Sequence, residues 1–231
     1  MSCHTIALSR LYSNSQGEAM TKTEEMTQNR ALWEGVSTTF DFLAQTANTT
    51  PDEASITELL AAVRAVPDDG GTSGCEAMRQ YADECANVPM SQVARELAVD
   101  WTLLFRGMNR QTGPKPPYAG AWLSSDGVGI AEMCAVNKHY VMAGFGTSGK
   151  VGNRHDYFGI ELEFVGRMAR RIAEGDERAA DALTSFLDSS VLPWFGAFVA
   201  QAAQKGKTAF WRGYLELVEA SLADVRELLA A

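Results

Sequence analysis

The sequence predicts an all-α protein, a single helical bundle of about nine or ten helices. Apolar residues recur at three- and four-residue spacing along most of the chain, and no sustained stretch alternates apolar and polar residues as a half-buried strand would. Alanine is frequent and runs of β-branched residues are scarce, which favours helix over strand. With 231 residues, 46% of them apolar, the chain can bury a full core in one domain without disulfides or a metal.

The first half of the chain contains four expected helices. Residues 1–26 are polar and lack a helical period, so we expect a disordered leader there and a single helical domain over residues 27–231. Helical spacing of apolar residues then predicts helices over about 29–46, from 49–53 to Val66, over 75–87 and from Ser91 to about Gly107. The segment 49–53 carries capping residues, a proline and first-turn acids, which are typical of a helix start.

The second half begins with a proline-rich loop, residues 108–117, and continues with four more helices. Helical patterns cover about 128–145, 156–174, 177–192 and 208–230, and Pro193 should kink or restart the third of these. In the helix 128–145 the expected inward residues are apolar: Ile130, Met133, Val136, Tyr140 and Val141. The glycine-rich loop 144–153 leads into the helix 156–174 and is a connector or a gate.

The helix 156–174 organises the prediction because one of its residues breaks the pattern. Asp156 is a good N-cap residue for it. At about 100° per residue, one broad face is apolar, formed by Tyr157, Ile160, Phe164, Val165, Met168 and Ile172. Glu161 lies in the middle of that face, where an unpaired carboxylate costs several kcal/mol or takes up a proton. Two interpretations stay open: a core carboxylate satisfied within the fold, or an acidic patch with Asp156 that awaits a cationic partner.

Four segments carry a resemblance to a known family. They are Leu97–Gly107 (LAVDWTLLFRG), Pro116–Leu123 (PPYAGAWL), Asp156–Phe164 (DYFGIELEF) and Phe186–Trp194 (FLDSSVLPW). In this order and spacing they are similar to motifs of the TorD/DmsD/NarJ-type redox-enzyme maturation chaperones, and the resemblance covers about residues 28–230. Two positions depart from the family pattern, because Tyr157 and Ser190 stand where the family has histidines. His155, two residues before the usual place, is the nearest substitute for the first, and these changes imply a different polar contact or a different client.

The resemblance implies a function and a site. Proteins of this family are cytoplasmic chaperones that bind the twin-arginine leader or the apo form of a molybdenum-cofactor oxidoreductase and delay its export until the cofactor is inserted. Carboxylates can pair bidentately with arginine, and an apolar groove can hold the leader's apolar run. The candidate groove has Asp156 and Glu161 as cation-binding carboxylates, Tyr157 and Phe164 as a wall, and Tyr118, Trp122 and Trp194 as an apolar rim. From spacing alone, these aromatic residues could equally be core packing.

Three alternatives remain for the function, and two for the assembly. The chain could be a NarJ-like assembly chaperone for a reductase subunit that is not exported, a nucleotide-binding protein or enzyme, or a purely structural helical adaptor. The segment GFGTSGKVG lacks the spacing of a phosphate-binding loop, which disfavours nucleotide binding. Bundles with glycine-rich connections can exchange segments between protomers, so both a monomer and a segment-swapped dimer are compatible with the sequence.

The composition of the chain limits the kinds of partner that it can bind and the kinds of reaction that it can catalyse. The net charge of −9 disfavours nucleic acid and anionic membranes but suits a cationic peptide. The four cysteines form no CxxC pair, and the three histidines (His4, His139 and His155) lack an evident nucleophile, so we expect no metal, no cofactor and no catalysis. No apolar run reaches membrane-spanning length and the N-terminus lacks a secretory pattern, so we expect a cytoplasmic protein with reduced thiols.

Overall fold

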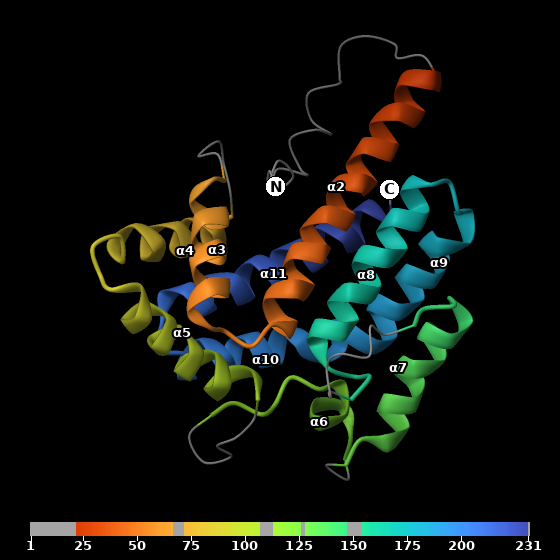
Figure 1. The fold of residues 1–231 in the computed structure, drawn as a ribbon. Helices are drawn as coiled ribbons and strands as arrows, with labels where there is room; N and C mark the ends of the chain where they lie inside the picture. Colours follow the sequence, from red (N-terminus) through yellow and green to blue (C-terminus); the bar gives the residue numbers. More distant parts are fainter. Residues whose placement is uncertain (1–21, 67–71, 107–112, 126–127, 147–153, 231) are drawn as a thin grey trace.

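The computed structural model describes residues 22–66, 72–106, 113–125, 128–146 and 154–230, and all of its regular elements are helices (Figure 1). This confirms the all-α prediction. If α9, η1 and α10 are counted as one continuous helix, the described residues form nine helices, as expected. The elements are α2 (Lys22–Asn48), α3 (Glu53–Arg64), α4 (Ser73–Glu84), α5 (Met90–Phe105), α6 (Ala119–Leu123), α7 (Ile130–Met142), α8 (Phe158–Ala173), α9 (Glu177–Phe186), the π-helical turn η1 (Leu187–Val191), α10 (Leu192–Lys205) and α11 (Ala209–Leu228).

The beginnings of the first two helices bear on the sequence predictions. The expected leader, residues 1–26, lies mostly outside the described residues, and Lys22 already belongs to α2. The predicted start of the next helix within residues 49–53 is confirmed. Asp52 is the N-cap of α3, where its carboxylate accepts from the Ser55 backbone N–H at 2.7 Å, and the Ser55 hydroxyl accepts from the Asp52 N–H in return.

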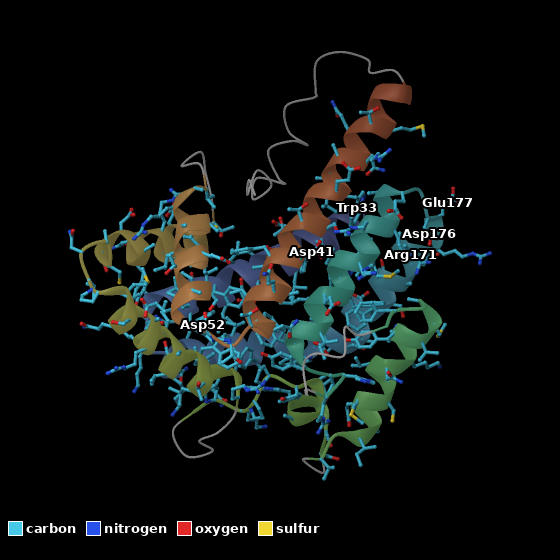
Figure 2. The ribbon with its side chains drawn as sticks, in the orientation of Figure 1. Trp33, Asp41, Asp52, Arg171, Asp176 and Glu177 are labelled. Carbon is cyan, nitrogen blue, oxygen red and sulfur yellow. The ribbon has the colours of Figure 1, made fainter. Side chains whose placement is uncertain are left out.

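Helices α2 and α8 pack side by side and run in opposite directions through the bundle (Figure 1). At one end the Asn48 side-chain amide donates to the carbonyl oxygen of Gly159 at 3.0 Å. Further along, Gly166 lets α8 approach closely, because a Cβ there would lie 3.2 Å from both Phe40 and the Asp41 carboxylate. Arg170 then pairs with Asp41 at 2.6 Å. Figure 2 shows where Asp41 lies on α2. Helix α2 therefore fixes where α8 begins.

Helices α4 and α11 form a second close antiparallel pair. A Cβ on Gly213 would lie 2.6 Å from the Gly74 carbonyl oxygen, so the two backbones are nearly in contact. The neighbouring helix α5 is tied to the start of α11 by Asp100, which is fully buried. Its carboxylate accepts from the backbone N–H groups of Lys207 and Thr208 and from the Thr208 hydroxyl at 2.7–3.0 Å. This buried carboxylate is satisfied, which is why it belongs to the framework of the fold.

A continuous helix of 29 residues, Glu177–Lys205, contains the predicted irregularity before Pro193. The π-helical turn Leu187–Val191 lies immediately before this proline, and the Leu192 N–H donates to the Leu187 carbonyl. Since proline has no N–H and crowds the preceding turn, a locally widened helix accommodates it. By length and composition this helix alone, among the described residues, could span a membrane, and half of its apolar window is buried inside the bundle.

Helix α7 corrects part of the sequence analysis. Val136 and Tyr140 face the core as predicted, but Ile130 and Val141 are 59% and 70% exposed, so their predicted inward positions were wrong. At 100° per residue, Ile130 lies about 120° around the helix from Val136. Because apolar residues surround this helix on most sides, their spacing did not fix which side faces the core.

Candidate functional site

A short backbone junction joins two of the segments that the sequence singled out. Tyr118 and Tyr157 form an isolated antiparallel bridge. The Ala119 N–H donates to the Asp156 carbonyl at 3.0 Å, and the Phe158 N–H donates to the Pro117 carbonyl at 3.1 Å. We call this the 118–157 junction. It places the PPYAGAWL segment directly against the start of α8, although the two are almost forty residues apart in the sequence.

The carboxylate of Asp156 lies at the centre of this junction and is fully buried. The prediction that Asp156 is the N-cap of α8 was wrong. Tyr157 holds that position, with an extended backbone and no side-chain cap, because it takes part in the bridge to Tyr118. The Asp156 Oδ2 atom accepts instead from the N–H of Gly120, in the first turn of α6, at 2.9 Å. Asp156 therefore stabilises the neighbouring helix rather than its own.

Arg154 is the cation that neutralises Asp156. Its Nε donates to Oδ1 and its Nη2 donates to Oδ2, both at 2.9 Å, in the bidentate geometry typical of arginine and carboxylate. The same guanidinium donates to the carbonyl oxygens of Val128 at 2.8 Å and Gly129 at 3.1 Å. The sequence analysis missed Arg154. The one available signal was an arginine two residues before an aspartate, which is too common to indicate a site.

Two glycines shape the turn that supplies those carbonyl oxygens. Gly129 has φ +68°, a left-handed conformation that favours glycine, and a Cβ there would lie 2.3 Å from the Gly120 Cα. A Cβ on Gly120 would lie 2.7 Å from both the Gly129 carbonyl oxygen and the Arg154 Nη2 atom. The two backbones can approach only because neither residue has a side chain, and this approach brings the 128–129 carbonyls to Arg154.

Glu161 lies one turn into α8, and its side chain is 1% exposed. Neither of its carboxyl oxygens has a hydrogen-bond partner among the described residues. Burial, and then the nearby charge of Asp156, raise the pKa of Glu161 well above its usual range. Glu161 is therefore not the satisfied core carboxylate of the first interpretation. The second interpretation, an acidic patch with Asp156 that awaits a cationic partner, stays a prediction, and both carboxyl groups are buried in this structure.

Tyr157 and Phe164, expected as a groove wall, both lie in the core. The Tyr157 hydroxyl donates to the Ala47 carbonyl at the end of α2, at 3.0 Å. Burial raises the pKa of Tyr157, so this hydroxyl stays a donor. Phe164 packs with ring centroids 4.6 Å from Phe186 and 5.0 Å from Tyr140, on the side of α8 that faces α9 and α7. The structure thus places Tyr157 at the junction and Phe164 away from it.

The three rim residues differ in accessibility. Tyr118 and Trp122 are half-buried, and we call them the aromatic rim, whereas Trp194 is only 1% exposed. Trp122 stacks on Trp194 with centroids 6.4 Å apart, and Tyr118 lies 5.4 Å from Tyr157. Each rim residue therefore covers one of the buried aromatic residues named as site candidates.

Three cations surround the aromatic rim. The Arg154 guanidinium lies 5.7 Å from the Tyr118 ring centroid, and the Lys115 ammonium lies 5.3 Å from the Trp122 centroid. The Arg106 guanidinium lies 5.4 Å from the Trp101 ring centroid. Burial raises the pKa of Tyr118, and the charge of Arg106 opposes that rise. The rim is thus locally basic in a chain whose net charge is −9.

His139 has a serine neighbour that the sequence did not reveal. The Ser189 Oγ atom lies 3.2 Å from the His139 Nε2 atom, but also 2.6 Å from the Ser185 carbonyl oxygen, so a backbone acceptor competes for the serine proton. Ser190, at the second departure from the family pattern, is buried, and its carbonyl oxygen accepts from the Trp194 indole N–H at 2.8 Å.

Two further expectations concern metals and the glycine-rich loop. The described residues contain no group of three or more potential metal ligands. Most of the glycine-rich loop 144–153, the possible gate, lies outside the described residues.

A family model described as the nitrate reductase delta subunit matches residues 68–200, which is more than half of the chain and includes both segments of the 118–157 junction. No curated protein matches the sequence significantly.

Proposed function

Because the chain belongs to the nitrate reductase delta subunit family, we propose that it is a redox-enzyme maturation chaperone whose client is the catalytic subunit of a molybdenum-cofactor oxidoreductase. In this role it acts in the cytoplasm and performs no catalysis. It binds the client's twin-arginine leader and delays export until the cofactor has been inserted.

One observation carries the leader-binding part of this proposal. At the 118–157 junction a fully buried carboxylate, Asp156, holds a guanidinium in a bidentate pair. A leader with paired arginines offers the same chemical group, and its apolar run can pack on the aromatic rim. Glu161 supplies a second buried carboxyl, which has no hydrogen-bond partner among the residues that the structure describes. Asp156 and Glu161 are thus the proposed cation-binding residues, and Tyr118 and Trp122 are the first aromatic contacts.

Tyr157, Phe164 and Trp194 contribute in a second way. All three are buried, so they reach a leader only if the residues above them move. Trp194 becomes accessible when Trp122 swings away, and Tyr157 when Tyr118 does, because these are the rings that cover them. Phe164 lies away from the junction, packed against Tyr140 and Phe186. Its proposed role is to hold α8 in place.

Calorimetric titration with a synthetic twin-arginine leader tests the proposal. The leader should bind at micromolar concentration or tighter, and changing both arginines to alanine should weaken binding more than tenfold, because the charge-assisted pairs are lost. Asp156→Asn should weaken the same interaction more than tenfold, whereas Asp176→Asn, which removes a carboxylate at the far end of α8, should not. Circular dichroism checks that each variant keeps its helix content. Equal binding of both peptides by the wild-type protein would contradict recognition through arginine.

The basic rim favours one alternative, an assembly chaperone for a reductase subunit that is not exported. Arg106, Lys115 and Arg154 would repel a leader rich in arginine that approached along the aromatic rim. A client segment without paired arginines would not meet this electrostatic repulsion. If the protein binds the apo catalytic subunit equally well with and without its leader, this second candidate function is the better one.

A further inference from the structure

Four oxygen atoms from two segments of the chain accept hydrogen bonds from the Arg154 guanidinium. They are both carboxylate oxygens of Asp156 and the carbonyl oxygens of Val128 and Gly129, at 2.8–3.1 Å. The carboxylate comes from the segment before α8 and the carbonyls come from the turn before α7. A guanidinium has five N–H donors in a fixed plane, and four of the bonds that they can form are made here.

The two partners of this pair differ sharply in exposure. The Asp156 side chain is 0% exposed, whereas the Arg154 side chain is 40% exposed. The Arg171–Asp176 pair at the junction of α8 and α9 is different, because its side chains are 35% and 30% exposed and both partners lie at the surface (Figure 2). At the 118–157 junction the acceptors belong to the interior and the cation reaches them from the solvent side.

We propose that Asp156 and the carbonyl groups of Val128 and Gly129 form a receptor for a guanidinium group, that Arg154 fills this receptor from within the chain, and that an arginine of the client enters it by replacing Arg154. The receptor itself follows from the geometry alone. The identity of the incoming arginine rests on the proposed function.

The exchange conserves the interactions that keep Asp156 buried. A carboxylate without a counter-charge at 0% exposure is strongly destabilising or takes up a proton, so Asp156 stays ionised only while the site holds a cation. An incoming guanidinium supplies the same charge and the same planar set of donors, and the displaced Arg154 can be hydrated because its side chain already reaches solvent. Arg154 lies two residues from Asp156 and therefore competes at a high effective concentration, which lowers the apparent affinity for any external arginine.

Chemical rescue tests the receptor without any client. Arg154→Ala should lower the thermal unfolding midpoint. Ethylguanidinium chloride at 20 mM should then raise the midpoint of this variant by at least 3 °C more than ethylammonium chloride does, because only the guanidinium matches the acceptor set. The wild-type protein, whose receptor is filled, should respond equally to both salts. If Arg154→Ala does not fold, Arg154→Gln, which has no positive charge, is tested in the same way. Equal responses of the folded variant to the two salts would overturn the receptor.

Leader affinity tests the exchange. Removal of Arg154 abolishes the internal competitor, so Arg154→Ala or Arg154→Gln should bind the twin-arginine leader at least fivefold more tightly than the wild-type protein. Arg171→Ala is the matched control, since it also removes an arginine that pairs with an aspartate and donates to a backbone carbonyl, and it should leave the leader affinity unchanged. Weaker or equal binding by the Arg154 variants would mean that Arg154 only supports the junction, and would overturn the exchange.

The two tests separate this inference from the proposed function. Arginine-dependent leader binding without guanidinium rescue would leave the proposed function standing and overturn the receptor. Rescue without leader binding to any variant would support the receptor and overturn both the leader-binding role and the exchange.

Discussion

At the scale of single residues, the two buried carboxyl groups near the 118–157 junction behave differently because their partners differ. Asp156 accepts from a guanidinium and from the Gly120 N–H, whereas neither oxygen of Glu161 has a partner among the described residues. Burial and the charge of Asp156 raise the pKa of Glu161, so in the folded protein Glu161 keeps its proton to a higher pH than in the unfolded chain. This difference makes the stability of the fold depend on pH.

Glu161→Gln should become increasingly stable relative to the wild-type protein as the pH rises from 5 to 8. The folded-state pKa of Glu161 lies above the unfolded value of about 4.5, so the stabilising effect of its protonation is complete below that value and is lost as the pH rises toward the folded-state pKa. Glutamine has no proton to lose. The stability difference should grow by up to about 1.4 kcal/mol per pH unit, measured by urea unfolding at each pH.

The control for this measurement is Glu174→Gln, at the exposed end of the same helical segment. Its stability difference from the wild-type protein should change little between pH 5 and 8. If the Glu161→Gln difference were equally flat, the side chain of Glu161 would have to be ionised and paired in the folded protein, contrary to its placement here.

Single residues also show which parts of the site the sequence could predict and which it could not. The helical period correctly placed Glu161 on the buried face of α8, because that helix has a wide apolar face and a charged opposite face. It could not indicate Arg154, since the contacts of this arginine with Val128 and Gly129 span about 25 residues of chain. It also assigned Asp156 to the wrong helix, because a capping residue in a sequence does not reveal which nearby N–H groups the fold brings to it.

At the scale of helices, the close pairs α2–α8 and α4–α11 hold the junction in place. Both pairs depend on glycine where the backbones come near each other. Helix α2 fixes the start of α8 through the Tyr157 hydroxyl and the Asn48 amide, and α4 fixes α11, whose neighbour α10 carries Trp194. The position of the candidate site is therefore a consequence of helix packing far from it.

Gly213→Ala should destabilise the protein by about 1–2 kcal/mol. The added Cβ would lie 2.6 Å from the Gly74 carbonyl oxygen, so α4 and α11 must move apart, and overpacking of this kind typically costs 1–3 kcal/mol. The better helix propensity of alanine stabilises the helix by about 0.5–1 kcal/mol and offsets part of this destabilisation. Urea unfolding followed by circular dichroism measures the net change.

Gly196→Ala is the matched control for this prediction. Gly196 is also a helical glycine, but the one atom near an added Cβ is the end of the flexible Glu219 side chain, at 3.0 Å. This substitution should be neutral or stabilising. Equal effects of the two substitutions would show that helix propensity, rather than the contact between α4 and α11, determines the result.

Helix α7 shows why the element-scale predictions were uneven. The apolar and polar faces of α8 and α9 are clearly separated, and the sequence identified their positions well. Helix α7 has apolar residues on most sides. The helical period therefore predicted the helix itself but not which of its sides faces the core. Tyr140 and Val136 became its buried side because Tyr140 packs against Phe164 and Phe186, and these contacts exist only in the folded chain.

At the scale of the whole molecule, the described residues form a helical bundle with a basic rim beside two buried carboxyl groups. The net charge of −9 alone suggested a cationic partner, but the charges are not evenly distributed. Arg106, Lys115 and Arg154 gather around the aromatic rim, while Asp156 and Glu161 lie beneath the surface. A partner that reaches the acids must therefore displace or pass these cations.

The fold class was the most predictable feature of this molecule, because helical periods and the order of the motif segments are local properties of the sequence. The candidate site was less predictable. Its centre depends on the Tyr118–Tyr157 bridge, on two glycines that allow close backbone approach, and on an arginine from a loop. These features arise only when segments from different parts of the chain meet.

The most direct test of the account is a map of amide chemical shifts in the ¹⁵N-labelled protein during titration with a twin-arginine leader. If the leader binds at the 118–157 junction, the largest changes should occur at Ala119, Gly120 and Phe158. The amides of Ala119 and Phe158 donate across the junction, and that of Gly120 donates to the Asp156 carboxylate. Little change is expected at Gly213, in the distant α4–α11 contact. If the leader binds but the largest changes lie elsewhere, with Ala119, Gly120 and Phe158 unaffected, the 118–157 junction is not the binding site and the central claim is wrong.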